Sequence, residues 1–133
     1  MTKQTWIQIA LAVNGAANLF AGAALLLAPT WFFQTIGTFP PLNQHYLGDA
    51  GAFLLPLGLG LLLALKDPRR HRLLIGMAAL AGLLHTGNHL YDDLILGHGT
   101  AAHLASTVEL LLQTGLLAWA WWALAAKGGG EAQ

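Results

Sequence analysis

Long apolar runs alternate with short polar segments along the chain. Four of these runs are long enough to cross a hydrocarbon layer of about 30 Å, a distance that takes about 20 helical residues. The sequence therefore predicts an all-α fold, an integral membrane four-helix bundle, with one domain over residues 1–127 and a short disordered tail over residues 128–133. The predicted spans cover residues 6–28, 46–65, 73–95 and 104–126.

The segments between the runs carry residues that end helices. Pro29 ends the first run, because proline lacks a backbone N–H donor. The basic segment 66–72 contains a proline and separates the second run from the third, and residues 97–99 predict a tight turn before the fourth. The segment 30–44 is rich in aromatic residues, so we expect it to lie at the level of the lipid headgroups.

Basic residues fall on one side of the predicted bundle. All six Lys and Arg residues lie before the first run, between the second and third, or after the fourth. Because basic residues are enriched in cytoplasmic segments, we expect both termini to be cytoplasmic.

The composition limits the chemistry that the chain can perform. Only 9% of its residues are charged, against roughly 25% in soluble domains, so the surface cannot face water on all sides and the bilayer is the expected partner. The formal net charge is zero, which gives no reason to expect binding to nucleic acid. The chain has no cysteine, which excludes disulfides, thiolate zinc sites, iron–sulfur clusters and covalently attached c-type haem.

Small and polar residues inside the runs predict how the helices pack. Glycines let transmembrane helices approach closely, and we expect this of Gly15, Gly22, Gly58, Gly60, Gly76 and Gly82. Asn14 and Asn18 are expected to form hydrogen bonds between helices. Asp93, near the end of the third run, is expected to be solvated at the membrane interface.

The remaining polar groups gather in the half of the bundle away from the basic residues. An ionisable group at the centre of a transmembrane helix costs at least about 2.5–3.5 kcal/mol, so such groups usually have a function. His85, Asn88, His89 and Asp92 follow the spacing i, i+3, i+4, i+7 and share one face of a helix. The pair of His45 and Asp49 in the second run also has i, i+4 spacing.

Two such faces can supply four nitrogen and oxygen ligands, which suits a divalent metal ion such as zinc, iron or copper. The expected metal ligands are His45, Asp49, His85 and His89. The expected catalytic residues, which would handle protons, are Glu109 and Asp92. The residues expected to contact a bound cofactor are Asn18, Asn88 and His103.

Haem b is the alternative cofactor. His85 and His89 cannot both be axial ligands of one iron, because both approach from the same helix. One of them would need His45 or His103 on the opposite side of the porphyrin. Haem would also need a flat cavity inside the bundle.

Two motifs give the chain a resemblance to a known group. Residues 43–51 read N-x-H-x-x-x-D-x-G and residues 85–89 read H-x-x-x-H. With the order of its four helices, the chain resembles small uncharacterised bacterial four-helix membrane proteins with a DoxX-like outline. The resemblance implies that His45, Asp49, His85 and His89 are shared residues and that the protein lies in the inner membrane of a bacterium. It implies no activity.

These observations leave several functions open. We expect a metal-dependent membrane enzyme, a hydrolase or an oxidoreductase, which acts on a lipid-like or small apolar substrate. A non-enzymatic haem-binding or metal-binding protein for electron transfer, sensing or metal handling is an alternative. A small transporter would need the chain to form a homo-oligomer, since the half of the bundle near the basic residues lacks polar groups. A purely structural bundle is the remaining alternative.

Overall fold

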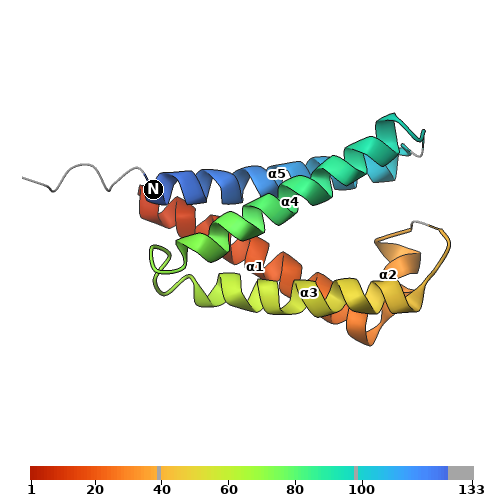
Figure 1. Cartoon of the computed structure of the whole chain (residues 1–133), viewed down its shortest axis with the longest axis horizontal. Helices are drawn as coiled ribbons and strands as arrows, with labels where there is room; N and C mark the ends of the chain where they lie inside the picture. The colour runs from red at the N-terminus through yellow and green to blue at the C-terminus, as the bar shows by residue number, and fades with distance from the viewer. Residues whose placement is uncertain (39, 98, 126–133) are drawn as a thin grey trace, which may run out of the picture.

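The computed structural model describes residues 1–38, 40–97 and 99–125, and this part of the chain is all-helical (Figure 1). The helices are α1 (Lys3–Leu27), α2 (Pro29–Thr35), α3 (Gln44–Leu63), α4 (Arg72–Leu94) and α5 (Ala101–Ala125). Four of them, α1, α3, α4 and α5, are long and apolar enough to cross a membrane. The predicted fold class and number of spans are therefore confirmed, and the protein is a multi-pass membrane protein. The predicted tail lies outside the described residues.

The helix ends follow local sequence signals. Thr2 caps α1, because its side chain accepts a hydrogen bond from the backbone N–H of Thr5 at 3.2 Å. Pro29 stands after the end of α1, as predicted, but it also opens the short helix α2 at a position where proline is favoured. The segment predicted to lie at the headgroups thus contains a helical turn. A hydrogen bond of 3.0 Å from the Gln44 side chain to the Thr30 hydroxyl connects α2 to α3.

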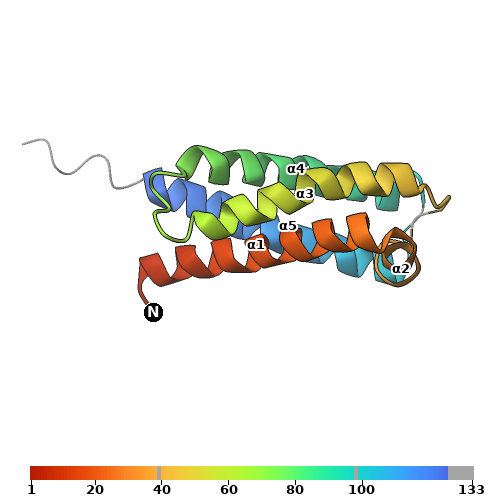
Figure 2. The same cartoon turned by 90° about the horizontal axis from the view of Figure 1, so that it is seen from below.

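The four long helices form two antiparallel pairs (Figures 1 and 2). One pair is α1 with α3, and the other is α4 with α5; α1 also packs against α5, whereas α3 and α4 barely meet. Figure 1 shows the two pairs close together near the N-terminus and diverging toward α2. We call the end with the N-terminus the basic end, because Lys3, Lys66 and Arg69 lie there, and the opposite end the polar end.

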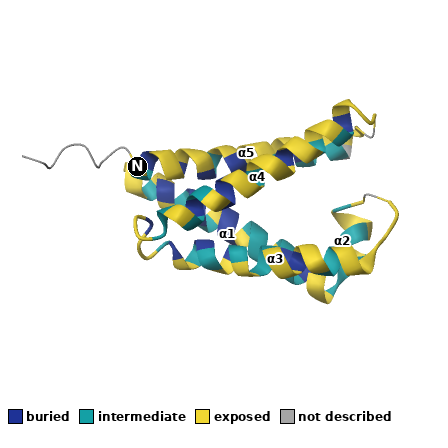
Figure 3. Cartoon of the chain, viewed as in Figure 1, coloured by how far each residue is buried: buried dark blue, intermediate teal, exposed yellow. Residues whose placement is uncertain are grey.

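The buried apolar core lies near the basic end (Figure 3). Its largest fully buried members are Leu11 of α1, Leu61 of α3 and Ile75 of α4. Large apolar side chains such as Phe53 and Leu73 remain exposed on the outside of the bundle. An apolar outer surface of this kind suits contact with lipid chains, which are as apolar as leucine.

Glycines bring α1 and α3 into close contact. Gly15 lies opposite Gly58, and Gly22 lies opposite Gly51, so each helix presents two glycines seven residues apart. A Cβ on Gly58 would lie 2.3 Å from the backbone nitrogen of Leu19, and a Cβ on Gly22 would lie 2.4 Å from that of Leu55. The backbones therefore touch where any side chain would separate them.

The predicted packing role of the other glycines is also confirmed. Gly76 and Gly82 of α4 face Trp121 and Thr114 of α5, and a Cβ on either would lie 2.6 Å from the nearest side-chain atom. Gly60 of α3 is less crowded, with 3.1 Å to the Leu74 side chain.

Polar bonds hold α4 to α5. The hydroxyls of Thr86 and Thr114 lie 3.3 Å apart, and the Thr107 hydroxyl donates to the Asp93 carboxylate at 2.7 Å. The two bonds are again seven residues apart on each helix. The expectation that Asp93 is solvated is wrong, because its side chain is buried between the two helices. Asp93 lies seven residues, about two helical turns, beyond Thr86, so it is on the face of α4 that packs against α5. Its neighbour Asp92 points in another direction and bonds Asn88.

Replacing Gly58 by Ala should destabilise the protein. The added Cβ would force α1 and α3 apart, and overpacking of this kind costs about 1–3 kcal/mol. We expect a lower thermal unfolding midpoint in detergent, measured by circular dichroism. Gly48→Ala on the same helix is the control, because a Cβ there meets nothing within 4 Å. Alanine is also the better helix former, so an equal loss in the control would contradict this account.

Candidate metal and ligand site

The histidine pair on α4 is the centre of the candidate site. His85 and His89 lie one helical turn apart, and their ring centroids are 4.9 Å apart with an angle of 64° between the ring planes. The rings thus meet edge to face on the same side of α4, as the i, i+4 spacing predicted. Neighbouring imidazoles of this kind can offer two nitrogen ligands to one metal ion.

A small cavity lies beside the histidine pair. Its volume is about 190 Å³, and all four long helices contribute to its wall. Most of the wall consists of Leu, Ala and Gly residues. The polar residues that line it are Asn14, Asn18, His85, Gln113 and Thr114. The cavity therefore combines an apolar interior with a few polar groups, which is typical of sites for small ligands.

The two asparagines of this wall form hydrogen bonds within their own helix, α1. Asn14 is buried and donates an amide hydrogen to the carbonyl of Ala10 at 2.9 Å, and Asn18 donates to the carbonyl of Asn14 at 2.8 Å. We expected bonds between helices, but these bonds lie within α1. A side-chain amide can bond the preceding turn of its own helix, and the α3 residues that share the cavity wall, Leu54 and Leu57, are apolar.

The two predicted catalytic carboxylates have different surroundings. Glu109 of α5 accepts a hydrogen bond of 2.9 Å from Gln113, which lines the cavity. Asp92 of α4 accepts a hydrogen bond of 3.3 Å from Asn88, on the outer side of the helix. Glu109 is therefore linked to the cavity through one side chain, and Asp92 to Asn88, one turn away on the same helix.

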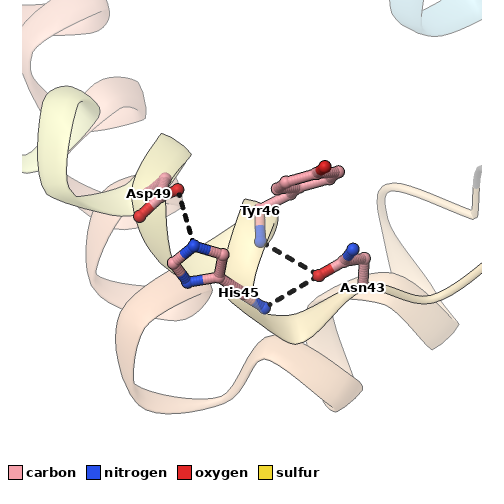
Figure 4. Close-up of polar contacts among 4 residues, drawn as sticks. All are labelled: Asn43, His45, Tyr46 and Asp49. Atoms are coloured by element: carbon pink, nitrogen blue, oxygen red, sulfur yellow. Dashed lines mark hydrogen bonds and ion pairs between the residues drawn. The ribbon is translucent and has the colours of Figure 1, made fainter.

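The second predicted ligand pair lies at the start of α3 (Figure 4). The Nε2 atom of His45 is 3.5 Å from the Asp49 carboxylate, and the two side chains are 80% and 58% exposed. The Asn43 side chain caps the helix, since its oxygen accepts from the backbone N–H groups of His45 and Tyr46. The cap fixes the first turn of α3 and thereby the position of the His45–Asp49 pair.

The two predicted ligand pairs, His45–Asp49 and His85–His89, do not come together in the structure. Among the residues that it describes, no group of three or more His, Asp and Glu side chains is close enough to hold one metal ion. The pairs lie on α3 and α4, the two neighbouring helices that barely meet. The four-ligand site thus stays a prediction.

His103, predicted to contact a cofactor, lies in the first turn of α5, where its backbone N–H donates to the Thr100 hydroxyl.

The polar contact between α4 and α5 was missed at the level of sequence. All four residues of this contact are buried and paired: Thr86, Asp93, Thr107 and Thr114. Of these, the predictions from sequence included only Asp93. Their seven-residue spacing on both helices was the available signal, because in an antiparallel pair it predicts two matched contacts. These contacts hold α5 against the helix that carries the histidines.

Compared with protein families, curated proteins and solved structures, the chain matches none of them.

Asp93 and Thr107 should be coupled energetically. A double-mutant cycle with Asp93→Ala and Thr107→Val should give a coupling between about 0.6 and about 1.7 kcal/mol, the mean and the maximum measured for hydrogen bonds between transmembrane helices. Unfolding in detergent by a chemical denaturant would measure it. The matched control is the cycle of Asn88→Ala and Asp92→Ala, whose bond is exposed and lies within one helix. A coupling no larger than that of the control would contradict the assigned role.

Proposed function

We propose that this protein is a membrane metal-binding protein in which His85 and His89 hold a divalent transition-metal ion beside a ligand cavity. The observation that carries the proposal is the edge-to-face contact of the two rings, 4.9 Å between centroids, with His85 in the cavity wall. Two imidazoles this close in an apolar helix would be costly without a partner. A shared metal ion supplies that partner, because it binds neutral imidazole nitrogens.

The arrangement also leaves room for a ligand. Two histidines fill only part of a four-coordinate site, so the remaining positions are available to water or to a bound molecule. The cavity of about 190 Å³ is smaller than the roughly 300–1,000 Å³ of sites for drug-sized ligands. We infer a small apolar ligand, or one end of a lipid-like ligand, in contact with its Leu and Ala side chains.

The size of the cavity favours a bare ion over haem b. A porphyrin is a large flat ligand, and a cavity of about 190 Å³ lies below the range for drug-sized molecules. An axial pair would also need a second histidine opposite His85 or His89. His45, the candidate on α3, is 80% exposed and is paired with Asp49.

An enzymatic role would use the metal together with Glu109. A zinc ion would supply Lewis-acid chemistry for hydrolysis, and iron or copper would supply redox chemistry. Glu109 is the carboxylate connected to the cavity, through its 2.9 Å hydrogen bond with Gln113, and we propose that it accepts or releases the proton. By the resemblance in its motifs, we propose that the protein lies in the inner membrane of a bacterium. The position of all six Lys and Arg residues on one side of the bundle supports cytoplasmic termini.

Removing either histidine should remove the metal. We expect elemental analysis of the detergent-purified wild-type protein to find one transition-metal ion per chain. In His85→Ala and in His89→Ala the affinity should fall at least about ten-fold, because even the loss of an outer-shell partner costs that much. The metal found also separates the reaction classes, since zinc favours a hydrolase and iron or copper an oxidoreductase. A strong absorbance band of haem in the visible spectrum would contradict the bare-ion assignment.

The controls use the other histidines of the chain. His71→Ala should retain the metal, because the His71 ring contacts the Asp67 carbonyl at the basic end. His45→Ala and Asp49→Ala test the four-ligand prediction directly: a fall in metal content would add the α3 pair to the site, and full occupancy would restrict it to α4. Metal that persists at full occupancy in both α4 variants would end the proposal.

A further inference from the structure

A second cavity lies at the basic end of the bundle, remote from the histidines. Its volume is about 100 Å³. It is formed where the start of α1, the turn between α3 and α4, and the last turns of α5 meet. Figures 1 and 2 both show these three segments gathered at the same end. The residues that line the cavity are Lys3, Gln4, Ile7, Arg69, Ala123 and Leu124.

The wall of this cavity has two chemically different sides. Lys3 and Arg69 come from segments far apart in the sequence and place two cationic side chains at one cavity. Ile7 and Ala123, each 2% exposed, form the apolar side together with Leu124. Among the residues that the structure describes, no acidic one lines the cavity. A cavity with two cations at one side and apolar groups at the other fits an amphiphile that carries a negative charge.

The charges nearby leave Lys3 and Arg69 unneutralised. The carboxylate of Asp67, the acidic residue of the same turn, accepts a hydrogen bond from the backbone N–H of Arg70 at 3.2 Å. Arg72 lies over the Trp121 ring at 4.9 Å and donates to the Trp121 carbonyl. Within residues 1–38, 40–97 and 99–125, neither Lys3 nor Arg69 forms an ion pair. Their charges are therefore available to an external anion.

We propose that this cavity binds the phosphate of an anionic phospholipid headgroup between Lys3 and Arg69. The site lies at the ends of three membrane segments, which is the depth at which lipid phosphates are found. Basic pockets between transmembrane helices bind such headgroups. The volume of about 100 Å³ admits a phosphate and leaves the acyl chains outside, along the exposed apolar faces of the helices. This site is independent of the metal proposed above.

Lipid binding by the full-length protein in detergent micelles tests the proposal. Native mass spectrometry would measure the binding of phosphatidylglycerol and of phosphatidylcholine with the same acyl chains. We expect preferential binding of phosphatidylglycerol. The affinity should fall about five-fold for Lys3→Gln or Arg69→Gln and roughly 25-fold for both together, as expected from the attraction of one basic residue to an anionic lipid. Equal binding of the two lipids would overturn the proposal.

The matched control is the double variant Lys66→Gln, Arg70→Gln. It loses the same net charge at the same end of the bundle, but neither residue lines the cavity, so phosphatidylglycerol binding should remain near that of the wild type. An equal loss in the control would show a diffuse charge effect and overturn the site. The variant Lys3→Arg, Arg69→Lys preserves both charges and should retain binding, which separates charge from folding. Inorganic phosphate is the last arm: displacement of the lipid by millimolar phosphate would assign the site to the free anion instead.

Discussion

Helices inside a bilayer gain nothing from hiding apolar surface from one another, because the lipid around them is equally apolar. Their association depends on close packing and on hydrogen bonds. Glycine packing joins α1 to α3, and hydrogen bonds are added to glycine packing between α4 and α5. α1 and α3 meet at opposed glycines, where a Cβ on Gly58 would lie 2.3 Å from backbone. α4 and α5 meet at Thr86–Thr114 and Asp93–Thr107. Each contact requires a glycine or a polar residue at a defined position on both helices. The register of each helix pair is therefore strongly specified.

The same constraint locates the candidate site. Since both pairs are tight inside and α3 barely touches α4, the space for a ligand lies between the pairs. The apolar core joins them near the basic end, and the pairs diverge toward α2. His85 and His89 stand on the helix that the polar contacts fix to α5. His85 and His89 therefore have a rigid support. The position of His45 and Asp49 depends instead on the capped first turn of α3.

The sequence was sufficient for the features that depend on a single helix. The four spans, the same-face spacing of His85 and His89, and the close packing at Gly15, Gly22 and Gly58 follow from periodicity and residue size. It was insufficient for features that depend on how one helix is rotated against another. The burial of Asp93 and the separate placement of the two ligand pairs belong to this class. The bonding of Asn14 and Asn18 within α1 does as well, because an asparagine side chain can bond the preceding turn of its own helix.

The paired threonines and the aspartate between α4 and α5 also bear on how the segment joining these helices can vary. The contacts are seven residues apart on both helices, and they align the helices without help from the connection between them. Insertions or deletions in the connection would leave this alignment intact, whereas a single residue inserted between Thr86 and Asp93 would turn the aspartate about 100° away from its partner. The interior of these helices is therefore intolerant of length changes, and the surface connection is the place where related chains are free to differ.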